Sequence, residues 1–158
     1  MPAVPRWRRL GLRGAGLFFL ATLAIAAGGS EAAAATITIR AQVILASNQG
    51  TGTDERLIPV AKQLSEAFRG YLRFELISTH SGDGQLGQPW RAALPGDRML
   101  EVTPTSVAER NYQFQVRVLN PKGEPLMNTS VRLGPGRPVF IGGLPHPPGI
   151  LAIALSAQ

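Results

Sequence analysis

The sequence contains no cysteine among its 158 residues. This excludes a disulfide framework, a thiolate metal site, a cysteine nucleophile and a lipid-modified cysteine anchor. Only two histidines are present, so we expect neither a transition-metal site nor a bound cofactor. Charged residues are also scarce at 16%, while hydrophobic residues make up 44%, a balance typical of a folded chain rather than a disordered one.

The positive charge is concentrated near the N-terminus. Residues 1–35 hold four arginines and one acidic residue, a net charge of +3. Residues 36–158 hold twelve basic and nine acidic residues, also a net charge of +3. The basic residues of this longer part form no stripe or cluster, and we therefore expect no nucleic-acid partner.

Residues 1–35 have the order of a secretory signal peptide. Basic residues up to Arg13 precede an uncharged, mainly apolar stretch from Gly14 to Ser30, and small residues follow to Ala35. This order predicts cleavage after Ala35, with Ala27 as the alternative. A second alternative is an uncleaved anchor, but the 17 uncharged residues fall short of the ~20 that span a membrane. We expect an exported protein with no stable membrane span after cleavage.

Two arginines in the basic segment bear on the route of export. Arg8 and Arg9 form the pair that marks a twin-arginine signal. Trp7 stands before the pair, and Gly11 occupies the place of a bulky apolar residue, so the ordinary unfolded-export route is favoured. The expected destination is the periplasm or the outside of the cell.

Residues 36–158 are expected to form one β-rich domain. Turn-forming residues separate short segments that alternate polar and apolar side chains, which is the pattern of half-buried strands. Seven such segments occur, at 36–45, 72–76, 99–103, 112–118, 127–133, 139–141 and 150–155. The sequence thus predicts a mostly β (α+β) fold, an antiparallel sandwich or rolled sheet of about seven strands with one helix packed on a face.

The single predicted helix follows Asp54, which can cap its N-terminus. Leu57, Leu64 and Phe68 recur at helical spacing, and Gly70 ends the pattern. Tight turns are expected where glycine meets a polar residue or proline, at 81–84, 95–97, 120–123 and 134–136. A break in the chain is expected at 142–143 and again at 145–149, which is rich in proline.

The loop between the first strand and the helix is the predicted ligand-binding site, formed by Asn48, Gly50, Gly52 and Asp54. The glycines allow a ligand to approach the backbone closely, and the helix N-terminus behind them favours an acidic group. The alternative is structural: a flexible connection in which Asp54 acts only as the cap.

No convergent set of catalytic residues is predicted. His80, Ser81 and Asp83 are interpreted as the polar end of a strand, because adjacent strand residues point to opposite faces. Glu75 and Glu101 alternate with apolar residues, as residues on a solvent-facing surface do, and the same holds for Glu109. The aromatic residues are expected to pack in the core rather than form a sugar-stacking platform; they are Tyr71, Trp90, Tyr112 and Phe140.

Three stretches resemble a group of short exported bacterial proteins with no established activity. The first is Val43–Gly50, followed by Asp54 and the amphipathic helix; the others are Met127–Val131 and Val139–Gly143. The turn Ile141–Leu144 is also similar to a short stretch in secretin channels of bacterial secretion systems. No catalytic residue is implied by either resemblance.

These observations favour an exported, non-enzymatic envelope module that binds a protein or polymer partner, including an accessory role in secretion or envelope assembly. The alternative is a small periplasmic hydrolase that uses Asp or Glu. Two acids facing each other across a cleft, about 5–10 Å apart, would favour the enzyme. An apolar patch or an unpaired sheet edge would favour the binding module.

Overall fold

The computed structural model describes residues 36–158; the predicted signal peptide and its cleavage site lie outside the described residues. Within this range the chain forms nine strands and one helical segment, which consists of a 3₁₀ turn, η1, and an α-helix, α1. Their bounds in chain order are β1 Ile37–Ser47, β2 Gly52–Thr53, η1 Glu55–Val60, α1 Ala61–Ala67, β3 Arg73–Gly84, β4 Trp90–Leu94, β5 Arg98–Ala108, β6 Asn111–Leu119, β7 Pro125–Leu133, β8 Val139–His146 and β9 Gly149–Ala157.

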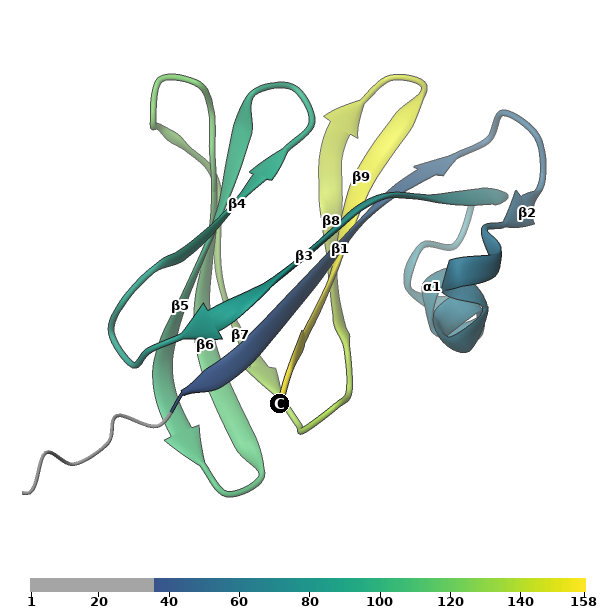
Figure 1. The fold of residues 1–158 in the computed structure, drawn as a ribbon. Coiled ribbons are helices and arrows are strands. Elements are labelled where there is room, and N and C mark those ends of the chain that lie inside the picture. The colour runs from purple at the N-terminus through teal and green to yellow at the C-terminus, as the bar shows by residue number, and fades with distance from the viewer. Residues whose placement is uncertain (1–35) are drawn as a thin grey trace, which may run out of the picture. The chain divides into compact units, whose positions relative to one another are not determined.

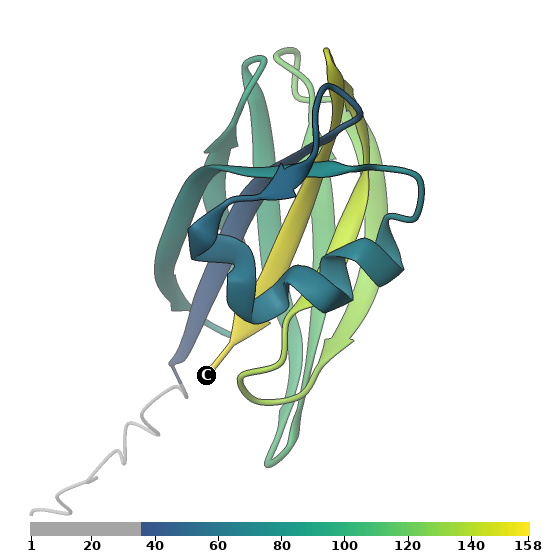
Figure 2. The same cartoon turned by 90° about the vertical axis from the view of Figure 1, so that its right-hand side faces the viewer.

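The strands form two sheets, and the helical segment adds a third layer (Figure 1). The five-stranded sheet has the order β2-β3-β1-β9-β8, and the four-stranded sheet has the order β4-β5-β6-β7. All neighbouring strands are antiparallel except β2 and β3. Figure 2 shows η1 and α1 lying across the outer face of the five-stranded sheet. The predicted β-rich sandwich with one helix on a face is confirmed.

Two hydrophobic cores hold the three layers together. The larger core fills the space between the sheets and includes the fully buried Phe114, in the middle of the most regular predicted strand. The smaller core lies between the five-stranded sheet and the helical segment, where Leu57 and Leu64 are fully buried. The helical stripe predicted from the sequence therefore faces this second core, with Phe68 packed at its edge.

The helical segment lies close to the sheet because the sheet presents small residues to it. Ala152 and Ala154 of β9 face the helical layer. The bulky residues that alternate with them, Leu151, Ile153 and Leu155, face the other sheet. On β8, a Cβ atom at Gly142 would overlap the ring of Phe68. That ring also meets Phe140 edge-on, with the ring centres 6.4 Å apart. The small residues on the outer face of β8 and β9 thus allow the helical segment to pack directly against the sheet.

The structure corrects three local predictions. The segment 81–84 is the end of β3 rather than a turn, because the glycines serve close packing: Gly82 lies against the ring of Trp90, and Gly84 lies against Ile39. Residues 142–143 do not break the chain but form an irregularity inside β8. The strand count rises from about seven to nine because β2 and β4 are added; β2 has two residues, too few for a detectable alternation.

The predicted turns at 95–97, 120–123 and 134–136 are confirmed as strand connections. The predicted break at 145–149 is shorter than expected, because Pro145 and His146 end β8, Gly149 begins β9, and only Pro147 and Pro148 connect the two strands. The aromatic side chains pack as expected, Trp90 and Tyr112 against the larger core and Tyr71 and Phe140 against the smaller one. Within residues 36–158, no helix is long and apolar enough to cross a membrane.

Candidate functional site

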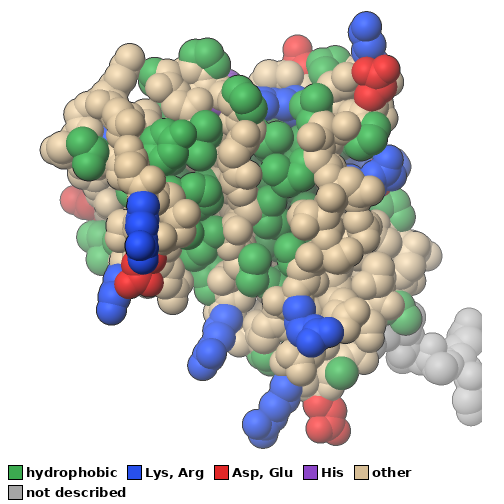
Figure 3. Space-filling model, turned by 180° about the vertical axis from the view of Figure 1, so that it is seen from behind, with side chains coloured by type: hydrophobic (Ala, Val, Ile, Leu, Met, Phe, Trp, Pro, Cys, Tyr) green, Lys and Arg blue, Asp and Glu red, His purple; other side chains and the backbone are tan. Residues whose placement is uncertain are grey.

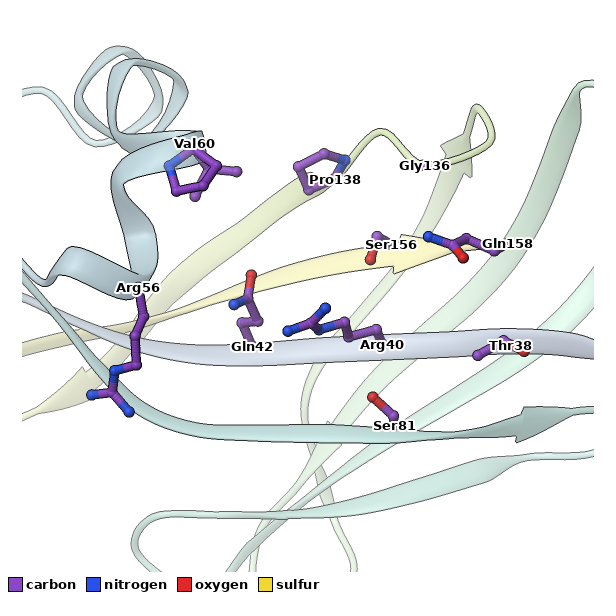
Figure 4. Close-up of a pocket in the computed structure, with 11 residues that line it drawn as sticks. Thr38, Arg40, Gln42, Arg56, Val60, Ser81, Gly136, Pro138, Ser156 and Gln158 are labelled. Atoms are coloured by element: carbon purple, nitrogen blue, oxygen red, sulfur yellow. The ribbon is translucent and has the colours of Figure 1, made fainter.

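A groove lies on the half of the five-stranded sheet that the helical segment leaves uncovered (Figure 4). It has a volume of about 430 Å³, within the ~300–1,000 Å³ range of ligand-binding clefts. We call it the Arg40 groove. Its lining residues are Thr38, Arg40, Gln42, Arg56, Pro59, Val60, Ser81, Gly136, Pro138, Ser156 and Gln158.

The floor of the Arg40 groove is a row of polar side chains that crosses three strands. Arg40 on β1 pairs in register with Ser81 on β3 and with Ser156 on β9. Neighbouring strands lie about 4.8 Å apart, so a hydroxyl stands on each side of the arginine stem. Figure 4 shows Arg40 on β1 between these two serines, with Gln42 further along the same strand. The row offers hydrogen-bond donors from a guanidinium, an amide and two hydroxyls.

Arg40 is exposed, and it makes no hydrogen bond or ion pair with any residue among 36–158. Asp83 lies one row further along the same face, outside the lining of the groove, and accepts a hydrogen bond from Thr38 at 3.4 Å. Four other arginines of residues 36–158 have neither an ion pair nor a side-chain hydrogen bond, and they lie in strand connections or on the edge strand β7: Arg69, Arg110, Arg132 and Arg137. Arg98 on β5 has no ion pair but donates to the backbone carbonyls of Pro95 and Pro145. Arg40 differs from the four unpaired arginines because it lies in the middle of a sheet, inside a groove.

The walls of the groove are partly apolar. Pro59 and Val60 at the end of η1 form one wall, and Pro138 between β7 and β8 forms the other (Figure 4). Arg56 also belongs to the first wall, but its guanidinium turns away from the floor and donates to both carboxylate oxygens of Asp54, at 3.0 and 2.7 Å. Arg40 is therefore the one lining arginine of the groove with no partner among the described residues.

Asp54 fixes the position of the helical segment. Its carboxylate accepts from the backbone N–H of Arg56 at 3.0 Å, which caps η1, and from that of Leu76 on β3 at 3.4 Å. The side-chain hydrogen bonds from Arg56 hold the pKa of Asp54 well below its usual range, and the two backbone N–H groups act in the same direction. The carboxylate thus connects η1 to the sheet and orients the wall of the groove.

The four residues of the predicted loop site do not come together around one cavity. Asn48 accepts a hydrogen bond from the backbone N–H of Leu72 at 3.2 Å, which ties the loop to the start of β3. Gly50 lies against the side chain of Arg73. Gly52 and Asp54 border a shallow hollow of about 280 Å³, to which Asn48 and Gly50 do not contribute. None of the four lines the Arg40 groove, and the side-chain oxygen of Asn48 and the carboxylate of Asp54 already accept hydrogen bonds.

The acidic residues considered for hydrolysis are separate from the groove. Glu75 pairs with Arg73 at 2.6 Å. Glu101, predicted as a solvent-facing residue, is instead only 6% exposed, because Arg91 and Arg117 cover it from the two neighbouring strands at 3.0 and 3.1 Å. Glu109 lies on the turn after β5. No acidic side chain lines the Arg40 groove, and residues 36–158 contain no cluster of three metal-ligating residues.

The two histidines also lie outside the groove. His80 meets Ser78, two residues earlier on β3, at 3.1 Å. His146 meets the guanidinium of Arg98 at 3.2 Å near the connection of β8 and β9. Ser81, the neighbour of His80, points to the opposite side of the strand and lines the groove. The predicted separation of His80 from Ser81 is therefore what the structure has.

The outer face of the four-stranded sheet has a different character, because its polar side chains bind one another. Arg91, Glu101 and Arg117 form one network across β4, β5 and β6. Gln115 of β6 donates to Asn128 and accepts from Ser130, both on β7. The polar groups at the centre of this face are therefore paired, whereas Arg132 on the edge strand β7 has no partner among the described residues and borders a hollow of about 310 Å³.

β7 and β8 are edge strands of their two sheets. In the described part of the chain, β7 and β8 each pair with one strand only. Figure 3 shows hydrophobic side chains gathered in the middle of the side that lies behind the view of Figure 1. Met127, Val131 and Val139 of β7 and β8 are partly buried and pack on the larger core. An unpaired sheet edge is the feature that we expected of a binding module rather than of a hydrolase.

The fold and the groove define this chain as a β-sandwich domain with one helical layer and a polar surface groove. Comparison of the chain with protein-family models, with curated proteins and with solved structures gives no match.

A signal for the groove is present in the sequence of β1. Alternate residues of the outer face read Thr38, Arg40, Gln42, Ile44 and Ala46, so their polarity changes halfway along the strand. The apolar half lies under the helical segment, and the polar half forms the groove floor. Sequence reasoning recognised the alternation but gave the polar half no role beyond facing solvent.

Proposed function

We propose that this protein is an exported, non-enzymatic binding module of the bacterial envelope that holds a protein or polymer partner in the Arg40 groove. One observation carries the proposal: an arginine with no partner among the described residues stands in the middle of a sheet, inside a groove of about 430 Å³ whose lining contains no acidic side chain. Such a cleft offers fixed donors to a ligand and no carboxylate pair for acid–base catalysis.

The surroundings support binding at this place rather than at the predicted loop. The groove floor belongs to β3, β1 and β9, the three inner strands of the sheet, so its side chains stand on a rigid base. In the loop, Asn48 and Asp54 already have backbone or arginine partners, and a ligand would have to displace them. A partner in the groove replaces only water at Arg40.

Site-specific crosslinking tests the proposal. Because the sequence contains no cysteine, a thiol-reactive crosslinker attaches to this protein only at the cysteine that is introduced. Ser156→Cys places a photo-crosslinker in the groove, and Ser130→Cys places the same group on the outer face of the other sheet. We expect the groove position to give a discrete adduct in cells of the native host and the Ser130 position to give none. Adducts from Ser130→Cys alone, or none from Ser156→Cys, would overturn the groove as the binding surface.

Export is tested separately by the N-terminus of the protein made in its host. We expect the processed chain to begin near Thr36, because the run of small residues ends there and β1 begins at Ile37. N-terminal sequencing of the protein from the cell envelope is the measurement. A chain that begins at Met1 in the membrane fraction would contradict cleavage and support the anchor.

A further inference from the structure

We infer that the Arg40 groove takes an acidic peptide segment, with a carboxylate on Arg40 and an apolar side chain against the prolines of the wall. This inference rests on the proposed function, because it requires the groove to be the binding surface. It adds the chemistry of the ligand, which the proposed function leaves as a protein or polymer.

The carboxylate follows from the donors of the floor. Arg40 presents a planar fork of N–H groups that matches the two oxygens of a carboxylate, and it has no partner among the described residues. Ser81 and Ser156 flank it in register on the neighbouring strands, where their hydroxyls can donate to the same anion. Asp83, on the next row of the same face, accepts a hydrogen bond from Thr38 and makes no ion pair with Arg40.

The rest of the lining favours a peptide over a polysaccharide. Gln42 and Gln158 carry amides, which both donate and accept and so complement the amide groups of an extended backbone. Pro59, Val60 and Pro138 give the walls an apolar surface that suits an aliphatic side chain. No aromatic ring lines the groove on which a sugar could stack. The combination of one cation, paired amides and apolar walls fits an acidic residue next to an apolar one.

Fluorescence anisotropy with two matched peptides tests the inference on the protein expressed from its complete sequence. The first probe is a short labelled peptide that alternates Glu and Leu, and the second replaces every Glu by Gln. We expect the acidic peptide to bind more tightly and to lose affinity as salt is added. Arg40→Gln should weaken binding of the acidic peptide about tenfold or more, because it removes a charge-assisted pair.

Matched variants separate the groove from general charge. Arg132→Gln removes an equal charge on the outer face of β7, and we expect it to bind like the wild type. Arg40→Lys keeps the charge without the fork and should recover part of the affinity. Thermal unfolding midpoints close to that of the wild type show that each variant is folded.

Three results would overturn the inference. Equal affinity for the Glu and Gln peptides would show that the groove does not recognise a carboxylate. A loss of affinity in Arg132→Gln equal to that in Arg40→Gln would show that only the overall charge matters. Polygalacturonate that binds through Arg40 more tightly than the acidic peptide would replace the peptide by an acidic polysaccharide. In each case the crosslink at Ser156→Cys can persist, so failure of the ligand chemistry is distinguished from failure of the groove as a binding surface.

Discussion

The outer faces of the two sheets meet solvent in opposite ways. On the four-stranded sheet, Glu101 lies between Arg91 and Arg117, and amide and hydroxyl groups of β6 and β7 bind one another. On the five-stranded sheet, the apolar half is covered by the helical segment, and the polar half holds Arg40, which has no partner among residues 36–158. The first face pairs the polar groups at its centre and has an unpaired arginine, Arg132, only on its edge strand, whereas the second has an arginine at its centre with no partner among the described residues.

This difference shows why an exposed polar face is not by itself a binding surface. Side chains that already pair across strands must give up those bonds before they bind a partner, and the cost offsets most of the gain. Arg40 gives up only bonds to water. The two faces therefore predict different consequences for equivalent substitutions, and four experiments test this contrast.

The largest effect is expected from the core that both faces share. Phe114 is fully buried under the four-stranded sheet, and Phe114→Ala should lower the free energy of unfolding by ~3–5 kcal/mol. Gln115 is the neighbour of Phe114 on the outer face and has hydrogen bonds to Asn128 and Ser130. Gln115→Ala should nevertheless lower the free energy of unfolding by less than ~1 kcal/mol. Denaturant unfolding measures both. Equal losses would show that the polar ladder of this face supports the fold as much as the core does.

The next effect concerns the helical layer that divides the five-stranded face. The methyl group of Gly142→Ala overlaps the ring of Phe68, so we expect a loss of ~1–3 kcal/mol in the free energy of unfolding and faster proteolysis within residues 55–70. Gly134→Ala is the control, because nothing lies within 4 Å of the added atom. If both variants unfold like the wild type, Phe68 does not hold the helical segment on β8.

A smaller effect compares the two faces directly. Glu101→Gln leaves two arginines without their carboxylate, and we expect a loss of ~1–2 kcal/mol, since Arg91 and Arg117 remain partly exposed. Arg40→Gln breaks no bond within the described structure and should change the free energy of unfolding by less than ~0.5 kcal/mol. Chemical unfolding of the two variants at the same pH is the measurement. A larger loss in Arg40→Gln than in Glu101→Gln would reverse the contrast between the faces.

The smallest effect is a dependence on pH at the wall of the groove. Because Arg56 lowers the pKa of Asp54 below its usual 3.8, the ionised carboxylate stabilises the fold at pH above that value, and this contribution is lost as the pH falls through the lowered pKa. The wild type should therefore exceed Asp54→Asn in stability at pH 7, and the difference should shrink below pH 4. Thermal unfolding between pH 7 and pH 2 measures this difference, with Glu109→Gln as the control. A difference that grows toward low pH would contradict the role given to Asp54.

Much of the architecture is predictable from local patterns. The alternation of Tyr112, Phe114 and Val116 identifies a half-buried strand, and the helical stripe from Leu57 to Phe68 identifies the covering segment. These patterns depend on residues two to four positions apart, and burial of one face is enough to produce them. Local patterns give the wrong prediction at residues 81–84, which continue β3 instead of forming a turn. Glycine favours a turn, but Gly82 here allows the ring of Trp90 to pack closely on the strand.

The sequence by itself determined the class of the fold, the helical segment and the polar and apolar faces of each strand, because side-chain period and turn chemistry are local properties. Only the tertiary structure decided which polar residues become a site. Arg40, Ser81 and Ser156 lie far apart in the chain and meet because the sheet order places β1 between β3 and β9. Whether an arginine is paired likewise depends on the neighbouring strands. Arg91 on β4 and Arg117 on β6 each have Glu101 of β5 beside them, whereas the residues beside Arg40 on β3 and β9 are serines.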